Sequence, residues 1–272
     1  MHLNETHGLG RFFSDTILFI LMSGAVIWIV HSGAIQSGYN WQWYRVPQYL
    51  WQFSNGHFIP GPLVQGLGIT LEISLVSLAL SSAFGLATAL CRMSGSISLT
   101  SLARIYLELI RNTPLLVQLF FIYFVVSPVL GFGRFFSAVL ALSLFEGAYA
   151  SEIIRAGILA VPREQWEASA SLGMSRFQTY THVILPQALT HMIPPLAGQM
   201  ISLVKDSALV STIALYDLTM EGQMIIAETY MVFELWFTIA GIYLVLTLTL
   251  SFVTRIMEKR FSSNRVLYSK PE

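Results

Sequence analysis

The sequence predicts an all-α polytopic membrane protein with about six transmembrane helices. Of its 272 residues, 54% are hydrophobic and only 11% are charged, whereas soluble domains carry about 25% charged residues. Six apolar segments are long enough to cross a hydrocarbon layer, which takes roughly 20 helical residues. The basic residues gather in alternate connections, a pattern that sets orientation in a membrane and does not indicate a nucleic-acid partner.

The expected spans are residues 16–35, 68–91, 115–130, 136–158, 195–216 and 233–256. The third span is short and lies between Pro114 and Pro128, which leaves its ends open because proline interrupts helices. The first span could instead be a signal peptide, since Arg11 precedes it and small residues follow. Its apolar run is long for a signal core, so we expect it to remain as an extra N-terminal span.

The arginines and lysines orient these spans. With both termini inside, only Arg45 and Arg134 lie outside and Lys205 lies within a span. The other basic residues fall on the cytoplasmic side: Arg11, Arg92, Arg104, Arg111, Arg155, Arg163, Arg176, Arg255, Lys259, Arg260, Arg265 and Lys270. This asymmetry follows the positive-inside rule and predicts a multi-pass inner-membrane protein with both termini in the cytoplasm.

An external loop after the first span concentrates tryptophan and tyrosine, in the run YNWQWYRVPQYLWQFSNGHF at residues 39–58. Aromatic side chains of this kind commonly form a belt at the outer membrane interface, which is the interpretation we favour. A docking surface for an external partner is the alternative.

A polar stretch, EQWEASASLGMSRFQTYTHVILPQAL, separates two apolar segments on the cytoplasmic side. Pro162 and Glu164 suit a helix start, and Gly173 suits a helix end. Ser175 and Gln178 have the spacing of a capping box that begins a second helix. Helical spacing predicts an inward face of Trp166, Ala170, Gly173 and Phe177 and an opposite face of Glu164, Glu167 and Ser171.

Three interpretations compete for this helix–glycine–helix unit. A plain connector is usually only a few residues long, whereas this loop runs over about residues 159–192. A DNA-reading helix-turn-helix needs a basic face, which Glu164 and Glu167 oppose. A docking element for a cytoplasmic protein fits better.

The same stretch carries a spaced motif: Glu167, Ala168 and Ser169, then Gly173, then Val183 to Pro186. It resembles the EAA motif of ABC importer permeases, with Ser169 in place of an alanine and Val183 in place of an isoleucine. Further blocks resemble the polar amino acid uptake branch of that family and extend the resemblance over about residues 66–260: LELIRNTPLLVQLFF (107–121), EIIRAGI (152–158), PREQWEAS (162–169) and ISLVKDSALVS (201–211).

The resemblance implies an importer permease that moves a polar amino acid by alternating access. It implies a five-span permease domain at residues 67–260, preceded by the N-terminus (1–15), the extra span (16–35) and the external loop (36–66), and followed by a tail (261–272). It assigns coupling to an ATPase to Glu164, Glu167, Ala168, Ser169, Leu172, Gly173 and Pro186.

The implied partners complete a transport machine. They are cytoplasmic ATPase subunits that bind ATP and Mg, an external solute-binding protein, and a second copy of this chain or a homologous permease. This chain itself would hold no cofactor and catalyse no reaction.

Charged residues inside the expected spans are candidates for the substrate path, because burying an ionised side chain in a membrane is costly. Lys205, Asp206 and the adjacent Ser207 are expected near the middle of the fifth span, and Glu146 near the centre of the fourth. Lys205 and Asp206 could bind the carboxylate and amino groups of an amino acid, or could pair with Glu146 or Glu152 and hold the bundle together. For Glu152 a local pair with Arg155 is favoured.

Rival functions remain open from the residues alone. An ion-gradient-driven secondary amino acid carrier would often show inverted repeats, which we do not find. A structural assembly protein would not need Lys205 or Asp206. A membrane enzyme is disfavoured because no nucleophile and base stand at recognisable spacing, and neither Cys91 nor the six histidines have metal-ligand spacing.

Overall fold

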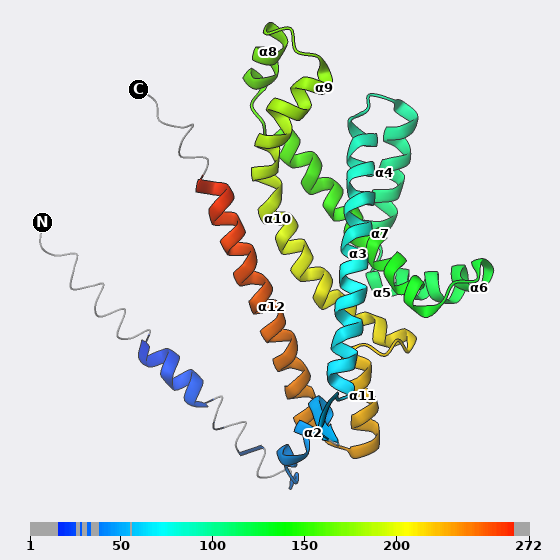
Figure 1. The fold of residues 1–272 in the computed structure, drawn as a ribbon, viewed down its shortest axis with the longest axis vertical. Helices are drawn as coiled ribbons and strands as arrows, with labels where there is room; N and C mark the ends of the chain where they lie inside the picture. The colour runs from blue at the N-terminus through cyan, green and yellow to red at the C-terminus, as the bar shows by residue number, and fades with distance from the viewer. Residues whose placement is uncertain (1–15, 26–27, 29–31, 34–37, 55, 264–272) are drawn as a thin grey trace, which may run out of the picture. The chain divides into compact units, whose positions relative to one another are not determined.

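The computed structural model describes residues 16–25, 28, 32–33, 38–54 and 56–263 (Figure 1). The chain forms two units, residues 1–43 and 44–272. In the first, a helix covers Thr16–Ala25, and the indole rings of Trp41 and Trp43 are stacked with centroids 6.1 Å apart. Most of the rest of the predicted first span, the predicted N-terminal segment 1–15, and residues 264–272 of the predicted tail 261–272 lie outside the described residues.

The second unit is a helical bundle with one small hairpin. Among the described residues, three helices are long and apolar enough to cross a membrane: α3 (Pro62–Met93), α7 (Arg134–Leu159) and α12 (Val232–Ser263), the last over Val232–Met257. The other helices are η1 (Trp43–Arg45), α2 (Pro47–Leu50), α4 (Ile97–Arg111), α5 (Leu115–Phe121), α6 (Ser127–Leu130), α8 (Arg163–Ser171), α9 (Arg176–Gln178), α10 (Leu185–Asp206), η4 (Ser207–Ile213) and α11 (Leu218–Thr229). The predicted all-α membrane fold is confirmed.

Helices α3 and α7 pack closely because small residues line their contact. A Cβ atom built on Gly85 would lie 2.8 Å from the Cβ of Ala150, and one built on Gly147 would lie 2.9 Å from the Cβ of Phe84. Ser77 and Ser81 of α3 are also buried. Small side chains let the two backbones approach closely. Close packing of this kind drives helix association in membranes, where the surrounding lipid is as apolar as the side chains and the hydrophobic effect does not act between helices.

The predicted third span is one arm of a bent pair. Helix α4, which the sequence analysis did not predict, meets the segment Leu115–Leu130 at 106°. The bend falls at Asn112–Pro114, where proline cannot continue the ladder of hydrogen bonds. The buried Gln118 side chain closes the bend, because its Nε2 donates to the carbonyl oxygens of Ile110 (2.7 Å) and Thr113 (3.0 Å).

Two π-helical turns each end two residues before a proline. They are η2 (Ile122–Val126), ahead of Pro128, and η3 (Thr179–Ile184), ahead of Pro186. Proline lacks the N–H that would bond to the carbonyl four residues back, and a wider turn relieves the clash of its ring with that carbonyl. The chain therefore runs helically through both prolines.

The fifth predicted span, 195–216, was misplaced. Helix α10 begins ten residues earlier than predicted, at Leu185, and ends at Asp206, where the 3₁₀ helix η4 takes over up to Ile213. Lys205 and Asp206 therefore stand at the end of α10, where it passes into η4. Buried Val210 and Ile213 of η4 join the core with Leu142 of α7, so packing rather than lipid explains their apolar character.

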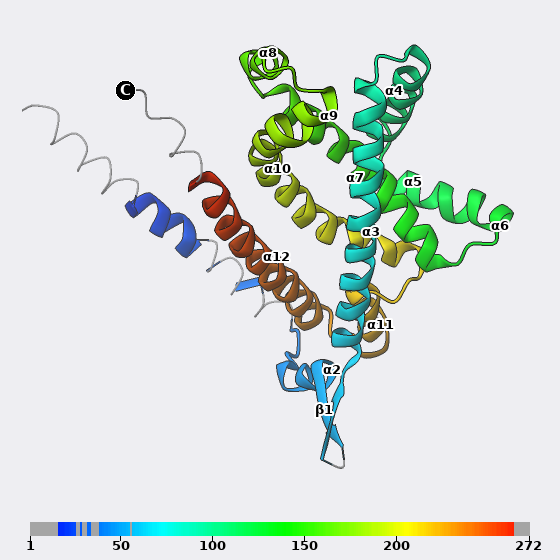
Figure 2. The same cartoon turned by 45° about the horizontal axis from the view of Figure 1, so that its top comes forward.

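The aromatic loop that the sequence analysis expects to be external contains a hairpin that was not predicted. Strands β1 (Trp51–Ser54) and β2 (His57–Pro60) pair antiparallel, with Phe53 opposite Phe58. Figure 2 shows the hairpin at the start of α3, at the opposite end of this unit from α8. It is fixed there by Gly61, whose N–H donates to the Leu50 carbonyl (2.9 Å) and whose missing side chain leaves room for the Tyr49 carbonyl. Its role as an interfacial belt stays a prediction.

Candidate coupling unit and buried polar sites

The helix–glycine–helix unit predicted for the polar stretch is confirmed. Helix α8 ends before Gly173, which takes φ +71°, the left-handed conformation that glycine adopts readily. Ser175 then caps the next helix with a full capping box: its Oγ accepts from the Gln178 N–H (3.3 Å) and its N–H donates to the Gln178 side chain (2.8 Å). Local capping chemistry thus defines the whole unit.

The inward face of the unit differs from the predicted one. Trp166 packs edge-on against Tyr180, with ring centroids 5.1 Å apart, and Ser169 is buried and donates to the Gln165 carbonyl (2.7 Å). Ala170 and Gly173 are exposed and Phe177 is 76% exposed, so these three predictions were wrong. The helix direction changes after Gly173, and a face drawn across that turn does not persist.

All but one of the predicted coupling residues are exposed. Only Ser169 is buried, and Leu172 is 79% exposed although it is apolar. Glu167 pairs with Arg163 one turn earlier (3.1 Å). The exposed members of the set are Glu164, Glu167, Ala168, Leu172, Gly173 and Pro186. A rigid, exposed unit with an unburied leucine is a plausible surface for another protein.

Of the four predicted substrate residues, the structure brings two together. Glu146 of α7 is 1% exposed, accepts a hydrogen bond from the Gln199 side chain of α10, and interacts with the carboxyl group of Asp206. The other Glu146 oxygen, Oε1, has no hydrogen-bond partner among the described residues. A buried carboxyl oxygen without a partner is costly and marks a candidate functional site.

The other two predicted residues flank Asp206 in the chain but make no hydrogen bond to Glu146 or Asp206 among the described residues. Lys205 is exposed, and Ser207 is buried but donates its hydroxyl to the Val204 carbonyl (2.8 Å). The sequence analysis missed Gln199. A polar amide side chain in an apolar helix that also carries Lys205 and Asp206 could have identified it as a candidate.

A small cavity adjoins Glu146. It measures about 70 Å³ and its lining includes Ser81, Ser82 and Gln199. At about 30 Å³ per water molecule it has room for two waters, far less than the roughly 300 Å³ of a small-molecule pocket. In this conformation the polar site is closed.

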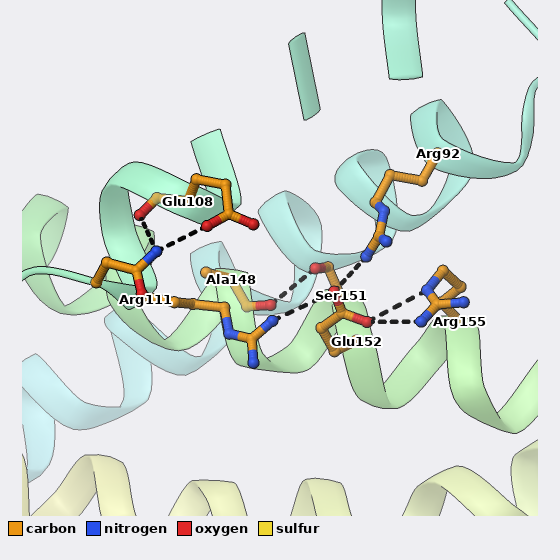
Figure 3. Close-up of polar contacts among 8 residues, drawn as sticks. Arg92, Glu108, Arg111, Ala148, Ser151, Glu152 and Arg155 are labelled. Carbon is orange, nitrogen blue, oxygen red and sulfur yellow. Dashed lines mark hydrogen bonds and ion pairs between the residues drawn. The ribbon is translucent and has the colours of Figure 1, made fainter. Parts of the chain in front are cut away.

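Three arginines converge on Glu152 (Figure 3). Arg155, one turn further along α7, bonds to Oε2 (3.0 Å), as the sequence analysis predicted. Arg92 at the end of α3 and Arg111 at the end of α4 both bond to Oε1, Arg111 at 3.4 Å. One carboxylate therefore ties α3, α4 and α7 together.

Asp217 caps helix α11 beyond the last turn of η4. Its Oδ1 accepts from the Met220 N–H (2.9 Å), and its Oδ2 accepts from the Tyr243 hydroxyl (3.5 Å). Burial raises the pKa of this carboxyl to about 6, and the hydrogen bonds from Met220, Thr219 and Tyr243 only partly offset that effect. The sequence analysis did not single out this residue.

No group of three histidine, cysteine, aspartate or glutamate residues able to hold a metal ion occurs in the described part of the chain. The polar sites are therefore described by their carboxylates, amides and guanidinium groups alone.

Known proteins match this chain in both sequence and fold. The family described as "Binding-protein-dependent transport system inner membrane component" matches residues 81–263. The glutamine transport system permease protein GlnP of Escherichia coli (strain K12) is 39% identical over 201 residues, which is 73% of this chain and 92% of that protein.

Solved structures agree with this match. A crystal structure of an amino acid ABC transporter with histidines is 40% identical, with a TM-score of 0.69, over 73% of this chain and 94% of that one. The inward-facing MetNI methionine ABC transporter, at 21% identity and a TM-score of 0.61, covers 73% of this chain and 95% of that one and shows the fold alone. The chain belongs to the family of inner-membrane components of binding-protein-dependent transport systems, as a transport subunit and not an enzyme.

Proposed function

We propose that the chain is the permease subunit of an ATP-binding-cassette importer that carries a polar amino acid across the inner membrane. Its similarity to a glutamine permease and to an amino acid transporter supports the substrate class. The observation that carries the proposal is the buried contact of Glu146 on α7 with Gln199 on α10, beside Asp206. Polar groups held inside a membrane bundle suit a path for a polar solute.

Two neighbouring carboxyl groups favour some amino acids over others. Glu146 and Asp206 attract a cationic or amide side chain and repel an acidic one. The closed cavity beside them opens only if α7 and α10 move apart, as alternating access requires. Arginine-like and glutamine-like substrates are therefore preferred to glutamate.

The exposed α8 unit is the site where an ATPase subunit docks on the cytoplasmic side. Its leucine, Leu172, and its acidic residues, Glu164 and Glu167, face away from the bundle. ATP and Mg bind to the ATPase, an external solute-binding protein delivers the substrate, and a second permease, identical or homologous, completes the pathway. Both termini lie in the cytoplasm, in agreement with the distribution of arginine and lysine.

Reconstitution tests the proposal. Proteoliposomes that contain this chain with its co-purifying ATPase and solute-binding protein should take up amino acid only when ATP is present on the side of the membrane where the ATPase is bound. Uptake by the chain without the ATPase, driven by an ion gradient, would identify a secondary carrier and contradict the proposal.

Cross-linking tests the docking site separately. In a Cys91→Ser background, which removes the single native cysteine, Leu172→Cys should cross-link to the ATPase subunit. Phe58→Cys is the matched control, because its side chain is also exposed but lies in the hairpin at the other end of the unit. Equal cross-linking from both positions would contradict docking at α8.

A further inference from the structure

The Glu152 cluster holds more positive than negative charge. Arg92, Arg111 and Arg155 all bond to the Glu152 carboxylate, so three guanidinium charges meet one carboxylate charge. The two excess positive charges lie close to the Glu152 carboxylate and to each other, so they repel one another. An added anion would relieve this repulsion.

Arg111 is the member best placed to meet an anion from outside. Its side chain is 45% exposed, more than those of Arg92 and Arg155. Its bond to Glu152 is the long one, at 3.4 Å, and its guanidinium lies 5.7 Å from the centre of the Tyr149 ring. The contact with the ring holds the guanidinium group in place. Its remaining N–H groups can still donate to a second acceptor.

The cluster lies at the depth of lipid headgroups. Glu152 is 18 residues after Arg134, the first residue of α7, which corresponds to about 27 Å along the helix, close to the ~30 Å hydrocarbon thickness. With Arg134 at the outer boundary, as the proposed orientation places it, Glu152 is at the cytoplasmic boundary. Anionic phospholipids of that leaflet attract basic groups at this level.

Helix α4 adds an apolar surface next to the cluster. Leu102, Ile105 and Leu109 are exposed and recur at helical spacing on α4, which ends at Arg111. With 3.6 residues per helical turn, this stripe lies on the opposite side of α4 from Arg111, so it can contact lipid acyl chains but does not itself lead to the arginines.

We propose that Arg92, Arg111 and Arg155 form a phosphate-binding site that holds the headgroup of an anionic phospholipid at the cytoplasmic face. Guanidinium groups bind phosphate oxygens through two parallel N–H donors, and Arg111 makes the outermost contact. A zwitterionic headgroup binds less well because its ammonium group meets the same positive surplus. The site rests on the proposed orientation of the chain but not on the identity of its substrate.

Native mass spectrometry of the full chain in detergent tests the site. Phosphatidylglycerol should bind more tightly than phosphatidylcholine of the same acyl chains. In Arg111→Gln this preference should fall about fivefold, the factor that corresponds to ~1 kcal/mol for one basic residue near a lipid surface, while Arg111→Lys should keep part of it. Arg104→Gln is the matched control, since Arg104 is exposed on the same helix but makes none of the bonds to Glu152.

Three results would overturn the proposal. They are equal binding of the two lipids, an unchanged preference in Arg111→Gln, or an equal loss in Arg104→Gln. Glycerol phosphate, added as a soluble competitor, separates the two sources of phosphate: displacement of the lipid at comparable concentration would assign the site to a soluble anion instead. Because this readout is lipid binding to the chain itself, it does not depend on whether amino acid transport is confirmed.

Discussion

Gly173→Ala isolates the mechanical role of the turn between α8 and α9. Gly173 has φ +71°, and nothing lies within 4 Å of the position that a Cβ would take. The substitution therefore creates no clash, and its cost is the conformational one of about 1–2 kcal/mol for a side chain in the left-handed region. That corresponds to roughly a 5- to 30-fold shift away from the native turn. We expect uptake per ATP hydrolysed to fall several-fold.

Gly95 offers a matched control for this experiment. It has φ +72°, is equally unobstructed, and lies in the turn between α3 and α4. Gly95→Ala should therefore cost similar stability but leave uptake per ATP unchanged, and Gly173→Asn should restore coupling because asparagine tolerates this conformation. Uptake and ATP hydrolysis are measured in the same proteoliposomes. Wild-type coupling in Gly173→Ala, or an equal loss in Gly95→Ala, would refute the role of the turn.

Three further predictions concern the polar groups of Glu152, Glu146 and Asp217. Glu152→Gln should lower the free energy of unfolding in detergent by about 1.5–3 kcal/mol, because it weakens charge-assisted hydrogen bonds. Glu167→Gln is the control: it breaks an exposed ion pair and should lower the free energy of unfolding by no more than ~0.5 kcal/mol. Equal losses in the two variants would contradict the idea that the less exposed Glu152 pairs are the stronger ones. Glu146→Gln should reduce uptake of arginine relative to glutamine in competition assays, and an unchanged ranking of arginine, glutamine and glutamate would remove Glu146 from the substrate path. Since burial raises the folded-state pKa of Asp217 from 3.8 to about 6, the contribution of Asp217 to stability should be greatest below about pH 4, and up to ~3 kcal/mol of it should be lost as the pH rises through 6. Asp217→Asn should flatten that dependence in thermal unfolding between pH 4 and pH 7, and a parallel pH profile in the variant would contradict the assignment.

The coupling unit could be predicted from the sequence because its structure is local. Gly173, Ser175 and Gln178 specify a helix end and a helix start within six residues, and the structure shows both. The inward face was harder to predict, since Phe177 follows the turn and the helix axis changes there. Trp166 finds its partner, Tyr180, across that turn.

Contacts between distant segments could not be predicted. The apolar run continues through η4, but the α-helix α10 changes to a 3₁₀ helix after Asp206, and η4 packs in one core with Leu142 of α7. Glu152 and Arg155 were paired from their spacing on one helix. Arg92 and Arg111 lie 60 and 41 residues away from Glu152, so only the fold reveals that they share its carboxylate.

The capping box at Ser175 and the side chain of Gln199 lie on one continuous run of helices, which can act as a lever. From Ser175 the chain continues through η3 and α10 without leaving a helical path, and it reaches Gln199 24 residues later, or about 36 Å at 1.5 Å per residue. A tilt of only about 5° at one end of such a lever moves the other end by about 3 Å, the length of a hydrogen bond. A small displacement of the end at Ser175 is thus enough to separate Gln199 from Glu146.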